Sequence, residues 1–191
     1  MIIDMNPVTK QRVINTDGCS RRFSCNGMNR RGFTIVELIV VISVMGILLI
    51  LSVVNLRGSQ IDARDTERKT DIETIALHLD TFYKSGTEDS TSVGWYPSTV
   101  IVGTETTILR DIDPKSLATP GTTSSSLVAA TNSTQTTAGV SPQPDINQYV
   151  YQPIQSDGTL CTLVTQECRK FNLYYRLEKD NTVYILTGKN Q

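Results

Sequence analysis

Few side chains in this 191-residue sequence are of a type and spacing that could do chemistry. The chain has four cysteines and a single histidine, His78, and no serine or cysteine nucleophile signature accompanies that histidine. Cys161 and Cys168 have no second cysteine pair nearby that would complete a zinc site. The sequence also lacks a phosphate-binding glycine loop. It therefore predicts no catalytic residue, no metal and no cofactor.

One carboxylate stands in an unexpected environment. Glu37 lies in "RRGFTIVELIVVISVMGILLILSVV", the most apolar stretch of the chain, five residues after Gly32. A carboxylate in such surroundings needs a positive partner, or it takes up a proton. The role of Glu37 therefore depends on the element that holds it.

The apolar stretch is long enough to cross a membrane. Residues 38–54 carry no charge, and residues 33–56 would form about 36 Å of helix against a hydrocarbon core of about 30 Å. A cleaved secretory signal would be shorter and would end in a small-residue cleavage site, which the following "VNLRGSQ" lacks. The remaining interpretations are a plain membrane anchor and an anchor that is cut before the apolar run.

The charge distribution predicts how this segment is oriented. Residues 1–32 hold six Lys and Arg against two Asp, a net charge of plus four, so the rest of this chain of net charge −1 carries minus five. A basic segment ahead of an apolar helix stays in the cytoplasm. Everything after the helix is therefore expected to face outward.

The opening of this stretch resembles the N-terminal signature of type IV pilins and their pseudopilin relatives. The matching features are a basic pair, Gly32, Phe33, Glu37 at the fifth position after the glycine, and a long uncharged helix. The resemblance implies that a prepilin peptidase cuts between Gly32 and Phe33 on the cytoplasmic side, and that the new amine of Phe33 is N-methylated. Residues 1–32 would then be a cleaved leader, or a shorter one if translation starts at Met28.

The resemblance also implies a role for Glu37. Cleavage would create a positive amine at Phe33, one helical turn away. In a filament of parallel helices, Glu37 of one subunit could meet that amine on a neighbour and set the axial stagger. The alternative is a glutamate whose side chain reaches the lipid headgroups. Gly46 favours either close helix packing or the locally melted stretch of some family members, although no proline follows it within the apolar helix.

The helix is predicted to continue over residues 57–84 with a different character. Apolar side chains recur there at helical spacing and mark one buried face: Ile72, Ile75, Ala76, Leu79, Phe82 and Tyr83. Charges of both signs over residues 62–71 predict a solvated or subunit-facing stretch. Gly86 is expected to end the helix.

Residues 85–148 are predicted to form the loop region between the helix and a sheet. Trp95 and Tyr96 are expected to fold back onto the helix as part of the core. Residues 119–148 hold twelve Ser or Thr, three prolines and almost no charge, which predicts an exposed loop. O-glycosylation is one functional interpretation and N-glycosylation at the Asn132 sequon is another, while an unmodified loop is the alternative.

Four short strands are predicted around residues 149–191. They are "QYVYQPI", "TLCTLV", "KFNLYYRLE" and "TVYILTG", joined by tight turns into an antiparallel meander with one face on the helix. Cys161 and Cys168 face the oxidising side and lie close in sequence, which favours a disulfide over two free thiols. Such a bridge would pin the turn between the second and third of these strands.

The predicted fold class is α+β and pilin-like, with one long N-terminal helix, membrane-spanning in its apolar half, packed on a C-terminal antiparallel sheet. The resemblance implies a non-enzymatic subunit of a type IV pilus that serves adhesion, motility or DNA uptake. The alternative is a pseudopilin of a type II secretion or competence machine. Expected partners are other pilin subunits in a homopolymer, the prepilin peptidase, the membrane, and the pilus assembly platform with its ATPase. The precursor would sit in the cytoplasmic membrane with its head outside, before it joins an extracellular filament.

Overall fold

The computed structural model describes residues 32–86 and 92–190, without the side chains of residues 54 and 55. Residues 1–31, which hold most of the predicted leader and its two cysteines, lie outside the described residues. The chain forms two compact units, residues 1–44 and 45–191. The boundary between them falls inside the long helix α1 (Ile35–Ser85).

Helix α1 is continuous and ends at a glycine. It runs through Gly46 without a break. Gly86 follows it with a φ of 67°, and its N–H donates to the carbonyl oxygen of Phe82 at 2.7 Å. A Cβ at Gly86 would lie 2.9 Å from the backbone nitrogen of Val93, so only glycine fits this backbone conformation and this space. The predicted end of the helix at Gly86 is confirmed.

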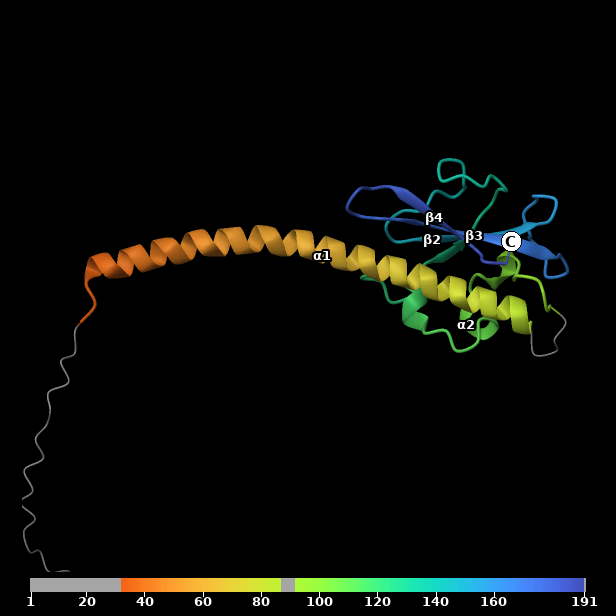
Figure 1. Ribbon diagram of the computed structural model, residues 1–191, viewed down its shortest axis with the longest axis horizontal. Helices are drawn as coiled ribbons and strands as arrows, with labels where there is room; N and C mark the ends of the chain where they lie inside the picture. The colour runs from red at the N-terminus through yellow and green to blue at the C-terminus, as the bar shows by residue number, and fades with distance from the viewer. Residues whose placement is uncertain (1–31, 87–91, 191) are drawn as a thin grey trace, which may run out of the picture. The chain divides into compact units, whose positions relative to one another are not determined.

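The second unit is built on a four-stranded sheet in the order β1-β2-β3-β4 (Figure 1). The strands are β1 (Leu127–Ala129), β2 (Tyr149–Gln155), β3 (Cys168–Arg176) and β4 (Val183–Thr187). β1 pairs with β2 in parallel, and the other two pairings are antiparallel. The predicted α+β, pilin-like class is confirmed, with a mixed and mostly antiparallel sheet in place of a pure meander.

The prediction of a strand at residues 159–164 is wrong. Only Leu160 makes a β-bridge there, to Ile154. The chain cannot extend further along β2 because Cys161 is bonded to Cys168, with the two Cα atoms 5.9 Å apart. The covalent closure brings the chain back at once, so the next strand starts at Cys168 and pairs directly with β2.

β1, which the sequence did not predict, lies inside the Ser/Thr-rich segment 119–148. It forms at Leu127–Ala129, where apolar side chains interrupt the polar composition. Further along the segment, Val140 is buried on the outer face of the sheet with Val150 of β2 and Tyr174 of β3. The structure therefore corrects the expectation of an exposed loop, because part of this segment is a strand and part covers the sheet.

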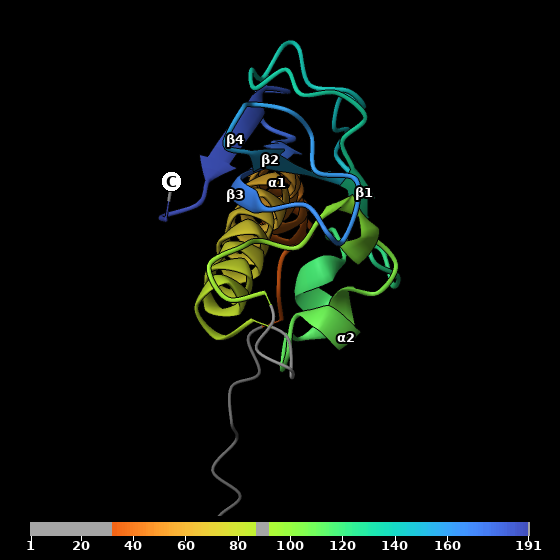
Figure 2. The ribbon, with the colours of Figure 1, turned by 90° about the vertical axis from the view of Figure 1, so that its right-hand side faces the viewer.

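The inner face of the sheet packs on the second half of α1, as Figure 2 shows. The predicted apolar face of the helix is buried, with five residues fully buried and Tyr83 partly so: Ile72, Ile75, Ala76, Leu79 and Phe82. These residues form one cluster with Tyr149 and Tyr151 of β2 and Phe171 of β3. The helical spacing of apolar residues thus predicted the helix side of the core.

The segment after α1 folds back on the helix. Tyr96 is buried, its ring centroid lies 4.7 Å from that of Tyr83, and its hydroxyl donates to Oδ1 of Asp80 at 2.8 Å. The predicted packing of Tyr96 is confirmed, whereas Trp95 is only half-buried. Three short helical segments follow: η1 (Thr99–Ile101), α2 (Glu105–Ile108) and η2 (Pro114–Leu117).

Candidate functional site

The candidate processing site lies immediately before α1. Gly32, Phe33 and Thr34 are not helical and are exposed, and Phe33 is 85 % exposed. An exposed segment without secondary structure can enter a peptidase without a helix having to unwind first. The bond between Gly32 and Phe33 is therefore accessible in the isolated chain.

Thr34 caps the helix, and the sequence reasoning missed it. Its Oγ1 accepts a hydrogen bond from the backbone N–H of Glu37 at 3.1 Å, and its carbonyl oxygen accepts one from Leu38 at 3.2 Å. The signal that predicts this cap is the Thr-x-x-Glu spacing in "TIVE", a capping-box pattern. The cap fixes the residue at which α1 begins, and so it places Glu37 in the first turn of the helix.

Glu37 stands in the first turn of α1 with exposed apolar neighbours. Ile35, Val36 and Leu38 are each more than half exposed, and large apolar side chains continue to be exposed through Val53. By length and composition, α1 is able to cross a bilayer. Among the described residues, none forms an ion pair with Glu37. In an apolar surrounding, its charge needs a partner that the described residues do not supply.

Comparison with known protein families gives a match to this same segment. Residues 27–53 match the family model described as the prokaryotic N-terminal methylation motif. The chain carries a type IV prepilin signal. The signal supports a type IV pilin or pseudopilin, which is a structural class, without separating the two. No curated protein and no solved structure matches the chain.

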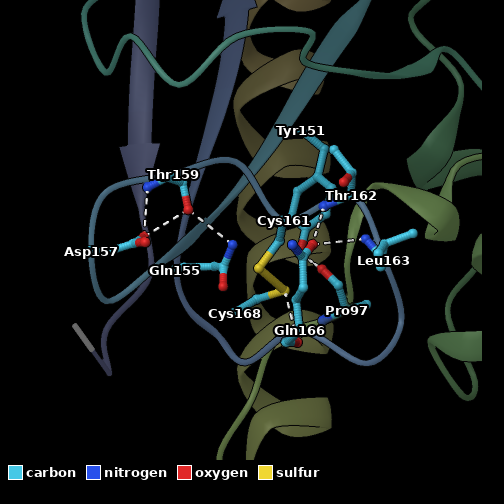
Figure 3. The surroundings of a disulfide bond; sticks show 10 residues. All are labelled: Pro97, Tyr151, Gln155, Asp157, Thr159, Cys161, Thr162, Leu163, Gln166 and Cys168. Atoms are coloured by element: carbon cyan, nitrogen blue, oxygen red, sulfur yellow. Dashed lines mark hydrogen bonds between the residues drawn. A yellow bond between two sulfur atoms is a disulfide. The ribbon is translucent and has the colours of Figure 1, made fainter.

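Beyond the prepilin signal, the predicted disulfide is present between Cys161 and Cys168, and both residues are buried (Figure 3). The backbone of each cysteine binds the segment that follows α1. The carbonyl oxygen of Cys161 accepts from Thr99 at 3.0 Å, and that of Cys168 accepts from Tyr96 at 2.8 Å. The bridge therefore joins the end of β2, the start of β3 and the segment that follows α1.

The loop closed by this disulfide is organised by Gln166. Its Oε1 accepts hydrogen bonds from the backbone N–H groups of Thr162 at 2.7 Å and Leu163 at 2.9 Å (Figure 3). Leu163 and Val164 are nevertheless exposed. The loop is thus a compact turn with an apolar tip.

Asp65 and Arg68, two charged residues in the second half of α1, are buried. Arg68 is only 1 % exposed, and its Nη1 lies 2.8 Å from Oδ1 of Asp65 and 3.6 Å from Oε2 of Glu178. Asp65 also accepts from the backbone N–H groups of Glu178 at 2.8 Å and Lys179 at 3.0 Å. The prediction of a solvated or subunit-facing stretch is wrong for Asp65, Arg68 and Asp71, because all three are buried and find their partners within the chain.

This arrangement shifts the pKa of Asp65. Burial acts to raise the pKa, but the backbone donors of Glu178 and Lys179 and the guanidinium of Arg68 together outweigh burial. The pKa of Asp65 is therefore lower than the ordinary value for an aspartate. The cluster docks α1 on the turn between β3 and β4.

Asp71 lies six residues further along α1 and is also buried, but its pKa is shifted in the opposite direction. It is 7 % exposed, and its Oδ2 accepts from the hydroxyl of the fully buried Tyr149 at 2.9 Å. Burial raises the pKa of Asp71 to about 6, with Glu67 adding to the rise and the Tyr149 hydrogen bond opposing it. This carboxylate is the less well satisfied of the two.

The Asn132 sequon lies in the part of the chain that covers the outer face of the sheet. The Nδ2 of Asn132 donates to the carbonyl oxygen of Gly139 at 2.8 Å, and its Oδ1 accepts from Ser141 at 3.1 Å. The side chain is half-buried. The nitrogen that would carry a glycan is therefore already part of the fold, and glycosylation there would have to break its bond to Gly139.

No feature of a catalytic or metal site emerges in the part of the chain that the structure describes. His78 is half-buried at the edge of the buried face of α1. Among these described residues, no group of three or more His, Cys, Asp or Glu side chains could hold a metal ion.

Proposed function

We propose that this chain is a structural subunit of a type IV pilus. The precursor sits in the cytoplasmic membrane, prepilin peptidase cuts it between Gly32 and Phe33, and the amine of Phe33 is N-methylated. The mature chain then polymerises with other copies through α1, driven by an assembly platform and its ATPase. The resulting extracellular filament serves adhesion, motility or DNA uptake, and the subunit itself has no enzymatic activity.

The observation that supports this proposal best is the environment of Glu37. It lies within the matched prepilin signal, Thr34 caps its helix three residues before it, and no described residue offers it a positive charge. Transfer of an apolar helix from lipid to a filament core gives little hydrophobic gain, since lipid is as apolar as the helix. Close packing and the pairing of Glu37 with the Phe33 amine of a neighbour then hold the filament together.

The Glu37 pairing has a testable magnitude. Removing one partner of a buried charge pair costs about 3–5 kcal/mol, which is more than a hundredfold in an association constant. Glu37→Ala and Glu37→Gln are expected to be inserted and cleaved normally but to yield few filaments in a host that supplies the peptidase and the assembly machinery. Glu73→Gln, at an exposed glutamate of the same helix, is the matched control. Filament yields equal to wild type for the Glu37 variants would refute the register role.

The processing step is tested by mass spectrometry of filaments sheared from the cell surface. The expected result is a peptide that starts at N-methylated Phe33. Gly32→Val is expected to leave the precursor uncut in the membrane, whereas Gly58→Ala, at an open position within α1, is expected to be processed normally. A surface chain that retains residues 1–32 would overturn the proposal.

The alternative function is a pseudopilin of a type II secretion or competence machine, since the prepilin signal is common to both classes. The two differ in where the processed chain accumulates. A pilin is recovered in sheared surface fibres, and a pseudopilin remains with the cell envelope after processing at the same bond. The same shearing experiment therefore separates them.

A further inference from the structure

β4 is one of the two edge strands of the sheet in the second unit. β4 has β3 as its only neighbour in the sheet, and Figure 2 shows it at the outer side. Edge strands carry unpaired backbone groups that can bind another strand, and many proteins block this with short strands, charges, proline or bulges. The question is which groups of β4 are free and what could bind them.

The hydrogen bonds at the two ends of the β3–β4 pairing determine which backbone groups face outward. The N–H of Leu177 donates to Thr182 at 3.1 Å, and the N–H of Gly188 donates to Phe171 at 3.2 Å. Hydrogen-bonded and non-hydrogen-bonded pairs alternate along an antiparallel ladder, and the register between these ends is unbroken. Every second residue of β4, counted from Thr182, therefore turns its backbone groups toward β3.

The intervening residues turn their backbone groups away from the sheet. These are Val183, Ile185 and Thr187. Among the described residues, none forms a backbone hydrogen bond with the outward groups of these three. The strand, "VYILT", contains no charge and no proline, and Tyr184 and Ile185 are each 37 % exposed. β4 itself therefore has no charge, proline or bulge that would block pairing with another strand.

We propose that β4 pairs with β4 of a second copy of this chain, antiparallel and about a twofold axis through Ile185. Ile185 then lies opposite Ile185 of the second copy, and Val183 lies opposite Thr187. The three outward residues are symmetric about Ile185, so each outward N–H meets an outward carbonyl oxygen of the other strand. This self-complementarity is what a twofold contact requires.

Charges flanking the strand agree with the same register. Lys189 is exposed, and no described residue forms an ion pair with it. In the antiparallel pair, Lys189 lies opposite Asn181 and beside Asp180 of the second copy. Asp180 is exposed and is held in place by the hydroxyl of Tyr184 at 2.7 Å. Because the contact is twofold, a cation meets an anion at both of its ends.

The helix side of the edge provides space for the second copy. A groove of about 400 Å³ runs between α1 and β4, and its apolar walls include Ala76, Leu77 and Leu186. The register places Tyr184 of the second copy directly opposite Leu186, so its ring lies over this groove. The groove thus accommodates the largest side chain that the pairing brings to this face.

A single β4–β4 contact is small, and stable association is expected only where many such contacts form together. One pair of five-residue strands buries far less than the about 1,200 Å² of a stable interface. If the chain polymerises as proposed above, a twofold contact cannot repeat along one helical filament and instead joins subunits of two filaments. Many such contacts along two filaments would reinforce one another.

Cysteine cross-linking of the full-length chain in nonionic detergent tests the register. All variants carry Cys19→Ser and Cys25→Ser, and mild oxidation traps transient contacts. Ile185→Cys is expected to form a covalent dimer, since residues directly opposite in this type of pair have Cα atoms about 5.5 Å apart, within disulfide range. Thr187→Cys is the matched control on the same edge. Its two copies would lie about 14 Å apart, and no dimer is expected.

Two further measurements keep the test decisive. Val183→Cys and Thr187→Cys chains with different tags are expected to cross-link to each other and not to themselves. Tyr184→Cys mixed with Leu186→Cys is expected to do the same, and it covers the case in which Ile185→Cys does not fold, which Trp95 fluorescence would reveal. Equal dimer formation by Thr187→Cys and Ile185→Cys, or no mixed cross-link in either combination, would overturn the proposal. Neither result bears on the Glu37 and Gly32 tests, which do not involve β4.

Discussion

The free energy of unfolding is expected to depend on pH through the buried carboxylate of Asp71. Its pKa is raised from the ordinary value of 3.8 to about 6, mainly because the carboxylate is buried beside Tyr149. A group with a raised pKa in the folded state contributes stability that is fully present below pH 3.8 and is lost as the pH rises through about 6. Replacing Asp71 with Asn keeps a hydrogen-bonding partner for Tyr149 and removes the charge.

The size of the effect follows from the shift. About two pKa units correspond to about 3 kcal/mol at pH values above both pKa values, since one unit is 1.36 kcal/mol. Relaxation around the amide reduces this, so Asp71→Asn is expected to raise the free energy of unfolding at pH 7.5 by about 1–3 kcal/mol. Near pH 3.5 the carboxylate is already protonated in the folded state, and the variant and wild type are expected to differ little.

The assay is chemical unfolding of the full-length protein in nonionic detergent, followed by the fluorescence of Trp95, the only tryptophan of the chain. Unfolding free energies are measured from pH 3.5 to 8 for wild type, Asp71→Asn and the control Glu73→Gln. The difference between wild type and each variant cancels the titration of all other groups. An Asp71→Asn variant that is no more stable than wild type at pH 7.5, or one whose advantage grows toward acid pH, would refute the reasoning.

Three other perturbations are followed in the same assay. Asp65→Asn is expected to lower stability by about 2 kcal/mol at pH 7. It should also remove a loss that wild type suffers below about pH 4, since the lowered pKa of Asp65 stabilises the fold only above the ordinary aspartate pKa. Arg68→Met is expected to cost about 3–5 kcal/mol, because it leaves Asp65 buried without its cation. The double variant Cys161→Ser/Cys168→Ser is expected to lose about 2.5 kcal/mol, the loop-closure value for so short a loop, and a loss near zero would mean that hydrogen bonds alone hold it.

The helix side of the fold could be predicted because it follows one period. The buried stripe of α1 in fact begins earlier than the apolar residues suggest: Asp65, Arg68, Ile72, Ile75, Leu79 and Phe82 follow one another at spacings of three and four. Two charged residues occupy positions of that stripe, so a search for apolar periodicity stopped short of them. The spacing itself was the available signal, and the partners that make burial possible come from Glu178 and Lys179, more than a hundred residues away.

The sheet was predicted less well because its pairings depend on distant contacts. β1 has three residues in a Ser/Thr-rich context, and its place is set by a parallel pairing to β2, which no local pattern encodes. The apolar run at residues 159–164 has the composition of a strand, but the Cys161–Cys168 bond turns the chain before a ladder can form. Local composition thus predicted the strands β2, β3 and β4, where strand-forming residues and the turn residues that flank them act together.

The charges of α1 separate what the chain completes by itself from what it leaves to another molecule. At Asp65 and Arg68 the fold supplies every partner, so these residues contribute to a stable unit that needs nothing further. At Glu37, among described residues, no such partner exists, although the surrounding apolar surface makes an unpaired charge most costly there. The fold pairs Asp65 and Arg68 with residues more than a hundred positions away in the sequence, but it brings no such partner from the described residues to Glu37. If the chain polymerises as proposed, the partner of Glu37 arrives with the next subunit, just as the proposed partner of the β4 edge is a second copy of the chain.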